Sequence, residues 1–131
     1  MTTRRRPRVT LTDRVTELML TLPWPPSVNT YWRSYQGRNI LSKAGRAYQQ
    51  AGVAALAGQQ VPQLGTARVQ VTLTLYPPDR RRRDVDNYIK APLDLLTKAR
   101  VWDDDSQIDR LTIERGPVVR GGRVDVEVTQ L

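Results

Sequence analysis

The feature that most restricts the fold is a strict alternation of apolar and polar residues from Ala67 to Leu75, in the stretch ARVQVTLTLY. Successive side chains of a β-strand point to opposite faces, so this pattern predicts a strand with one buried face and one polar face. Such a strand needs neighbours in a sheet and a second layer that covers its apolar face. The rest of the chain must therefore supply further strands and covering helices.

Three more stretches are typical of strands: residues 15–22, which end at the prolines of LPWPPS, and the stretches IDRLTIER and GRVDVEVTQ near the end of the chain. A first helix of about sixteen residues is expected after Ser42, a good N-cap. Its narrow inner face is predicted to carry small residues and one tyrosine, namely Ala44, Tyr48, Ala51, Ala55 and Gly58.

A second helix is predicted from about Asp86 to Ala99, with an inward face of Val85, Ile89, Leu93 and Leu96. Pro92 complicates it, because proline removes a backbone donor; either the first turn is distorted or the regular helix begins later. The order β-α-β-α-β-β is that of an α+β domain with two main helices.

Residues 1–13 contain RRRPR and are expected to form a basic flexible arm, followed by a single domain over residues 14–131. The sequence has no apolar run long enough to cross a membrane and no visible secretory signal, so we expect a cytoplasmic protein.

Composition favours a polyanionic partner. The chain has 21 basic and 13 acidic side chains, a net charge of +8, and 18 of its basic residues are arginine. Arginine matches phosphate oxygens with two donors at once, which suits nucleic acid. Cysteine and histidine are both absent, which excludes disulfides, zinc sites built on those residues, thiolate nucleophiles and imidazole catalysis.

Seven of the ten aspartates lie between Asp79 and Asp105, beside the arginines of RRRRDVDNYIK. Two interpretations are open for this cluster. The arginines neutralise the carboxylates in a solvated patch, or the carboxylates bind a hard cation such as Mg²⁺ that hydrolyses phosphodiesters. In the second case Asp104 or Asp105 meets Asp84 and Asp86 only if the chain after Ala99 folds back toward the start of the second helix.

Lys90 follows Asp86 by four residues. On a regular helix the two side chains would share a face, where the lysine would either form an ordinary ion pair or act on the phosphate as an electrostatic catalyst. Spacing alone does not choose between the two.

The stretch RRRRDVDNYIKAPLDLLTKARVWDDDSQID, together with LPWPPSVNTYWR, LSKAGRAYQ and the late GGR, strongly resembles the RusA family of Holliday junction resolvases. These are small endodeoxyribonucleases common in prophages and bacteria. The resemblance covers residues 18–130 or so and implies a mixed α+β fold, a homodimer, four-way DNA junctions as substrate, and Mg²⁺ as cofactor, with Mn²⁺ as a possible substitute.

The resemblance also implies roles for individual residues. Asp84 and Asp86 match the two aspartates of the family's DxDN motif and Lys90 its catalytic lysine. The family's acidic pair falls on Asp104 and Asp105, and Asp105 is the expected third essential carboxylate. Asp103 turns the pair into a triplet, which leaves the ligand open by one residue. Arg100 stands where a helix-ending glycine is common, so the turn into the triplet is expected to differ.

DNA contacts are expected from the arginine run and from the stretch after LPWPPS. The residues in question are Arg80, Arg81, Arg82 and Arg83, which would grip phosphates, and Asn29, Tyr31 and Arg33, for which turn and packing roles are equally open. Two other functions stay open: a less selective flap or branch nuclease that uses the same carboxylates, and a noncatalytic basic DNA-binding module.

Overall fold

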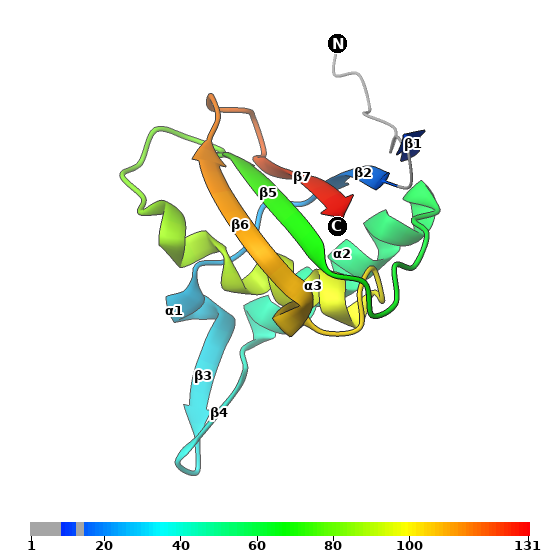
Figure 1. Cartoon of the computed structure of the whole chain (residues 1–131). Coiled ribbons are helices and arrows are strands. Elements are labelled where there is room, and N and C mark those ends of the chain that lie inside the picture. Colours follow the sequence, from blue (N-terminus) through cyan, green and yellow to red (C-terminus); the bar gives the residue numbers. More distant parts are fainter. Residues whose placement is uncertain (1–8, 13–14) are drawn as a thin grey trace.

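A mixed five-stranded sheet with two helices against one face forms the body of the protein (Figure 1). The computed structural model describes residues 9–12 and 15–131, with side chains from Glu17 onward. The elements in chain order are β1 (Val9–Thr12), β2 (Val15–Leu22), α1 (Val28–Tyr31), β3 (Trp32–Tyr35), β4 (Arg38–Leu41), α2 (Lys43–Gln59), β5 (Val69–Tyr76), the 3₁₀ turn η1 (Val85–Tyr88), α3 (Lys90–Lys98), the 3₁₀ turn η2 (Asp105–Gln107), β6 (Ile108–Arg115) and β7 (Arg123–Gln130).

The main sheet has the strand order β1-β2-β7-β5-β6, and β5 with β6 is its parallel pair. The other neighbouring strands of this sheet are antiparallel. Along β5 the predicted alternation is confirmed, because Val69, Val71, Leu73 and Leu75 are buried and the residues between them are half-buried. The expected α+β class and the four main strands are therefore correct.

The predicted arm needs a correction for four of its residues. Val9–Thr12 form β1, which pairs antiparallel with β2 in the register Val9↔Leu18 to Thr12↔Val15. This stretch alternates Val, Thr, Leu and Thr, which suits an edge strand. The rest of the predicted arm, residues 1–8 and 13, lies outside the described residues.

Helix α2 begins where predicted, and the Ser42 hydroxyl accepts a hydrogen bond from the Gly45 N–H at 3.0 Å. Its predicted inner face was wrong except at Tyr48. The buried positions are instead Gly45, Tyr48, Gln49, Gly52 and Leu56. Five of the six alanines of this helix are exposed, so the small apolar residues did not identify its inner face. Gly45 and Gly52 instead mark where α2 approaches its neighbours closely.

Pro92 delays the second helix, as one of the two alternatives predicted. Residues 85–88 form the 3₁₀ turn η1, and regular α-helix begins at Lys90. Pro92 then lies in the first turn of α3, where its missing N–H has no intrahelical acceptor to lose. Leu93 and Leu96 are buried as expected.

The turn after α3 has the ordinary geometry of a glycine-terminated helix despite its arginine. Arg100 adopts a left-handed φ of 64°. The Val101 N–H donates to the Leu96 carbonyl at 3.0 Å, and the Arg100 N–H to the Thr97 carbonyl at 3.1 Å, which together form a Schellman motif. The expectation of a different turn was wrong. In the described part of the chain, no helix is both long and apolar enough to cross a membrane.

Candidate active site

The arginine loop after β5 is braced by its own aspartate. A carboxylate oxygen of Asp79 lies 2.8 Å from Nη1 of Arg83, and the other lies 3.8 Å from Nε of Arg81. The Arg81 N–H also donates to Asp79 at 3.0 Å. Hydrogen bonds from Arg83 and from the Arg81 backbone hold the pKa of Asp79 below its usual value. Asp79 thus takes up part of the arginine charge of this loop.

Asp84 and Asp86 themselves are exposed. Asp84 caps η1 without a side-chain hydrogen bond, and Asp86 lies in the first turn. Among the side chains from residue 17 onward, neither carboxylate forms a hydrogen bond or an ion pair. In this part of the chain the arginines therefore do not neutralise the two aspartates, which leaves four carboxylate oxygens available to a cation.

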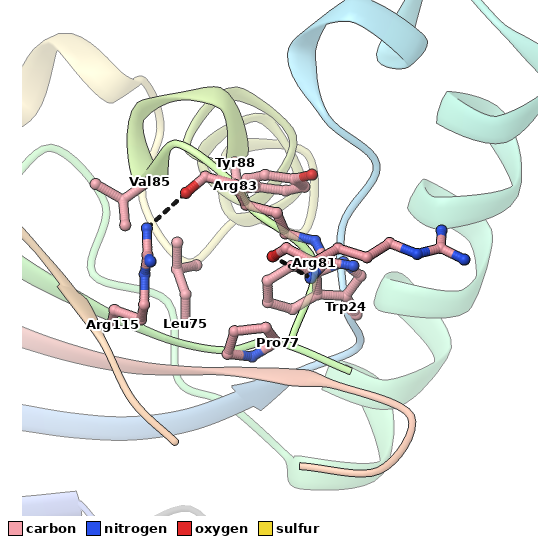
Figure 2. A pocket seen from close by; sticks show the side chains of 8 residues that line it. All are labelled: Trp24, Leu75, Pro77, Arg81, Arg83, Val85, Tyr88 and Arg115. Atoms are coloured by element: carbon pink, nitrogen blue, oxygen red, sulfur yellow. Dashed lines mark hydrogen bonds between the residues drawn. The ribbon is translucent and has the colours of Figure 1, made fainter. Parts of the chain in front are cut away.

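The residues on either side of Asp84 line a small pocket (Figure 2). Trp24 and Tyr88 form an aromatic wall, with ring centroids 5.1 Å apart, and the Arg83 guanidinium lies 5.6 Å from the Trp24 ring centroid. Arg115, at the end of β6, donates to the Arg83 carbonyl at 2.6 Å. The full lining is Trp24, Leu75, Pro77, Arg81, Arg83, Val85, Tyr88 and Arg115. These contacts fix the backbone immediately before Asp84.

Lys90 does not pair with Asp86. Its ammonium nitrogen lies 3.0 Å from a carboxylate oxygen of Asp94, one turn further along α3. The other oxygen of Asp94 accepts a hydrogen bond from the Tyr31 hydroxyl at 3.2 Å. Tyr31 in turn accepts from the Gln49 amide at 2.9 Å, and Gln49 accepts from Lys98 at 3.0 Å. A continuous polar network that extends into the protein interior thus fixes the position of the Lys90 ammonium.

Within the acidic triplet the three aspartates have different surroundings. Asp104 caps η2: its carboxylate accepts from the Ser106 N–H at 3.1 Å, while Gln107 accepts from the Asp104 N–H at 2.8 Å. Hydrogen bonds from Ser106 lower the pKa of Asp104. For the Asp103 and Asp105 carboxylates, the structure records no hydrogen bond or ion pair with any described side chain.

The chain has two acidic groups, Asp84 with Asp86 and the triplet 103–105, and they lie at opposite ends of β5. The Asp103 N–H donates to the Gly65 carbonyl at 3.1 Å, and Gln107 donates to the Gly65 and Ala67 carbonyls at 2.8 and 2.7 Å, all before β5 begins. Asp84 follows the other end, where Arg115 reaches the Arg83 carbonyl. The strand between these two ends has eight residues and is about 23 Å long, at about 3.3 Å per residue.

The fold-back that would join the acidic groups within one chain is therefore absent. Over the described residues, no three acidic side chains come close enough together to hold a metal ion. The nine-residue helix α3 carries the chain away from Asp86, and the turn at Arg100 leads it to the start of β6 and not back to η1.

The expected DNA contacts fall into two groups. Arg80, Arg81 and Arg82 are exposed, whereas the Arg83 side chain is only 14% exposed and is engaged by Asp79 and Trp24. Asn29, in α1, and Arg33, in β3, are exposed. Tyr31 is fully buried, and its hydroxyl belongs to the Asp94 network, so its expected place on the DNA surface was wrong and it has the packing role.

Four residues around the site were not predicted: Asp94, Trp24, Tyr88 and Arg115. Asp94 follows Lys90 by four residues, a spacing that indicates an ion pair on a helix, so the sequence did contain its signal. Trp24 and Tyr88 are far apart in the chain, and Arg115 meets Arg83 only because β6 lies beside β5. For these three no local pattern exists.

Comparison with known proteins identifies the family. The family described as "Endodeoxyribonuclease RusA" matches residues 23–129. Proteins named crossover junction endodeoxyribonuclease RusA from Escherichia coli K12 and from Enterobacteria phage 82 are each 42% identical over 113 residues, which cover 86% of this chain and 93% of theirs. The Shigella sonnei protein of that name is 41% identical over the same length. The family match spans the arginine loop, both acidic groups and strands β5 and β6, and the chain belongs to the RusA family of endodeoxyribonucleases.

Proposed function

We propose that this protein resolves Holliday junctions by Mg²⁺-dependent hydrolysis of phosphodiester bonds in opposing strands, and that it acts as a homodimer. Its relatives are named crossover junction endodeoxyribonucleases. The observation that carries the proposal is the division of charge in the arginine loop. Asp79 takes up arginine charge, and Asp84 and Asp86 are left exposed beside it, without an ion pair to any described side chain.

Asp84 and Asp86 fit a hard divalent cation. They offer only carboxylate oxygens, and Mg²⁺ is commonly held by one or two protein carboxylates with water and substrate phosphate in its remaining positions. Mn²⁺ accepts the same ligands. Bound there, the cation supplies the charge that activates a water and stabilises negative charge on the phosphate. Arg80, Arg81 and Arg82 contact the flanking phosphates, while Arg83 braces the loop.

Lys90 is assigned the role of an electrostatic catalyst. Lys90 is the first residue of α3, which follows η1, so it is four residues after Asp86 in the chain. Asp94 fixes that ammonium, and Tyr31 fixes Asp94. An ammonium positioned in advance stabilises developing phosphate charge without the cost of reorganising during the reaction.

Asp105 is assigned as the third carboxylate, because Asp104 is already engaged as the cap of η2. Because it lies beside the opposite end of β5 from Asp84, it completes the site only from another protomer. A twofold dimer creates two equivalent sites in which Asp84 and Asp86 of one protomer face Asp105 of the partner subunit. Two equivalent sites also suit a junction in which two opposing strands are cut.

The first experiment is cleavage of a labelled four-way junction beside a linear duplex and a flap of the same sequence, with Mg²⁺ or EDTA, by wild type and Asp86→Asn. We expect paired nicks in the junction alone, dependent on the metal, and abolished by Asp86→Asn while binding survives. Equal cutting of the flap and duplex would instead indicate a less selective nuclease. Binding without cutting, across several junction sequences and with Mn²⁺ also tried, would indicate a noncatalytic module.

Shared sites have a specific test. The variants Asp86→Asn and Asp105→Asn are each expected to be inactive. When they are mixed and allowed to exchange subunits, a site shared between protomers leaves one intact site in each mixed dimer, so single-strand nicking returns. A site contained in one chain would be damaged in both protomers, and the mixture would stay inactive.

A further inference from the structure

The β3–β4 hairpin stands apart from the main sheet and projects from the body of the protein (Figure 1). Its two-residue connection, Gln36–Gly37, has φ values of 48° and 74°, as a type I′ turn requires. Every residue from 33 to 39 is exposed. Two-stranded hairpins are marginally stable alone, and the exposed tip adds nothing to the core, so core packing does not account for it.

The root of this hairpin is held firmly. The Ser42 N–H donates to the Tyr31 carbonyl at 3.0 Å, and Arg46 donates to the Leu41 carbonyl at 2.9 Å. Gly45 passes so close that a Cβ at this position would lie 2.6 Å from the Tyr31 carbonyl oxygen. Tyr31 itself is fully buried. The base of the hairpin is therefore fixed to the body of the protein, while its tip is exposed.

One face of the tip combines an aromatic ring with two guanidinium groups. Tyr35 pairs with Arg38 across the strands, and Arg33 stands two residues before Tyr35, so the three side chains share a face. The Arg33 guanidinium lies 5.5 Å from the Tyr35 ring centroid, and half of Tyr35 is exposed. No acidic residue occurs between positions 32 and 41.

We propose that this hairpin binds unstacked DNA bases, with Tyr35 as the stacking platform and Arg33 and Arg38 on the neighbouring phosphates. Aromatic rings flanked by positive charge bind exposed bases of any sequence, because every base has a π-face. A continuous duplex hides those faces inside its stack, and a branch point, where helices separate, exposes them. The inference rests on the proposed junction cleavage and gives that activity its preference for branched DNA.

The position of the hairpin agrees with this role. It continues directly from α1, which packs against η1 and α3, the elements that carry Asp86 and Lys90. The Tyr31 hydroxyl at its root binds Asp94, which holds Lys90. The root of the hairpin therefore adjoins the elements that carry Asp86 and Lys90. A second copy of the chain is a poorer occupant, since the hairpin carries only positive charge and the whole chain is at +8.

The test is binding without cleavage, measured by fluorescence anisotropy in an Asp86→Asn background. Labelled four-way junction, single strand and linear duplex are compared for Tyr35→Ala, Tyr35→Leu and Tyr35→Trp. We expect the first two to lose about tenfold in affinity for the junction and the single strand, with duplex affinity unchanged, because both lack a ring. Tyr35→Trp keeps the ring and should bind all three DNAs like the parent.

Several outcomes would overturn the inference: unchanged junction affinity, an equal loss on all three DNAs, or a shift from dimer to monomer in sedimentation when the ring is removed, which would make the hairpin a dimerisation arm. Because binding is read without cutting, the two proposals fail separately. If wild type cuts no junction but Tyr35→Ala and Tyr35→Leu still lose affinity for single strands, the hairpin assignment stands and the proposed junction resolution is wrong. If wild type cuts junctions and the ring variants bind normally, the hairpin assignment alone is wrong.

Discussion

Replacing Tyr31 with phenylalanine should destabilise the protein, although it removes a single oxygen atom. That oxygen donates to Asp94 at 3.2 Å and accepts from Gln49 at 2.9 Å, and Gln49 is only 8% exposed. A buried donor left without its acceptor costs about 2 kcal/mol. An unfolding entropy of about 2.1 cal/mol/K per residue, for 131 residues, converts that cost to a fall in Tm of about 7 °C.

Tyr48 provides a matched control in the same core. It is 5% exposed, and its hydroxyl has no hydrogen-bond partner among the described residues. Tyr48→Phe makes the same chemical change but removes an unsatisfied polar group, so its Tm should equal or exceed that of wild type. Thermal denaturation followed by circular dichroism compares the three proteins. Equal losses in the two variants, or a Tyr31→Phe protein as stable as wild type, would refute the role given to the Tyr31 network.

Three substitutions and a change of pH also test the structure. Gly52→Ala should destabilise the protein by about 1–3 kcal/mol through overpacking, since the new Cβ would lie 2.2 Å from a methyl of the buried Leu95. Gly58→Ala in the same helix places its Cβ where nothing lies within 4 Å, so it should stabilise the protein by about 0.5–1 kcal/mol. Urea denaturation measures both changes. Arg100→Gly should stabilise by about 1 kcal/mol in the same assay, because φ is 64° there, and an unchanged midpoint would argue against the left-handed turn. Burial raises the pKa of Tyr31 from 10.0 to about 12; the hydrogen bond from Gln49 opposes this shift and the charge of Asp94 adds to it. The protonated Tyr31 hydroxyl therefore contributes its full stabilisation below pH 10, and this contribution is lost by about pH 12. Over that interval the urea midpoint of Tyr31→Phe should fall less than that of wild type.

The sequence predicted best those elements whose signals are local. Alternation located β5, and Ser42 located the start of α2, because strand periodicity and helix capping act over a few residues. The hairpin was missed although Gln36–Gly37 offered a turn signal. Its strands bury almost nothing and therefore show no apolar alternation.

For the site, the sequence identified which residues are exposed more reliably than which residues meet. Asp84 and Asp86 are as accessible as a metal site requires. Whether Asp105 meets them in one chain depended on the direction of the chain after α3, which the sequence left open and the tertiary fold decides. Tyr31 was misplaced for a related reason: an aromatic residue among polar ones looks like a surface contact until the hydroxyl's buried partners are known.

The parallel pairing of β5 with β6 also has a consequence for the order of folding. Strand β6 pairs in parallel with β5 only after the long connection between them has closed. Here that crossover, residues 77–107, contains the arginine loop, Lys90 and all the carboxylates assigned to catalysis, and β6 is an edge strand. Partly folded chains in which β6 has not yet docked therefore lack the Arg115 contact that fixes Asp84. A newly made chain therefore becomes able to cut DNA only when β6 is in place, and pulse-labelled hydrogen exchange should find protection of β6 and the onset of cleavage on the same timescale.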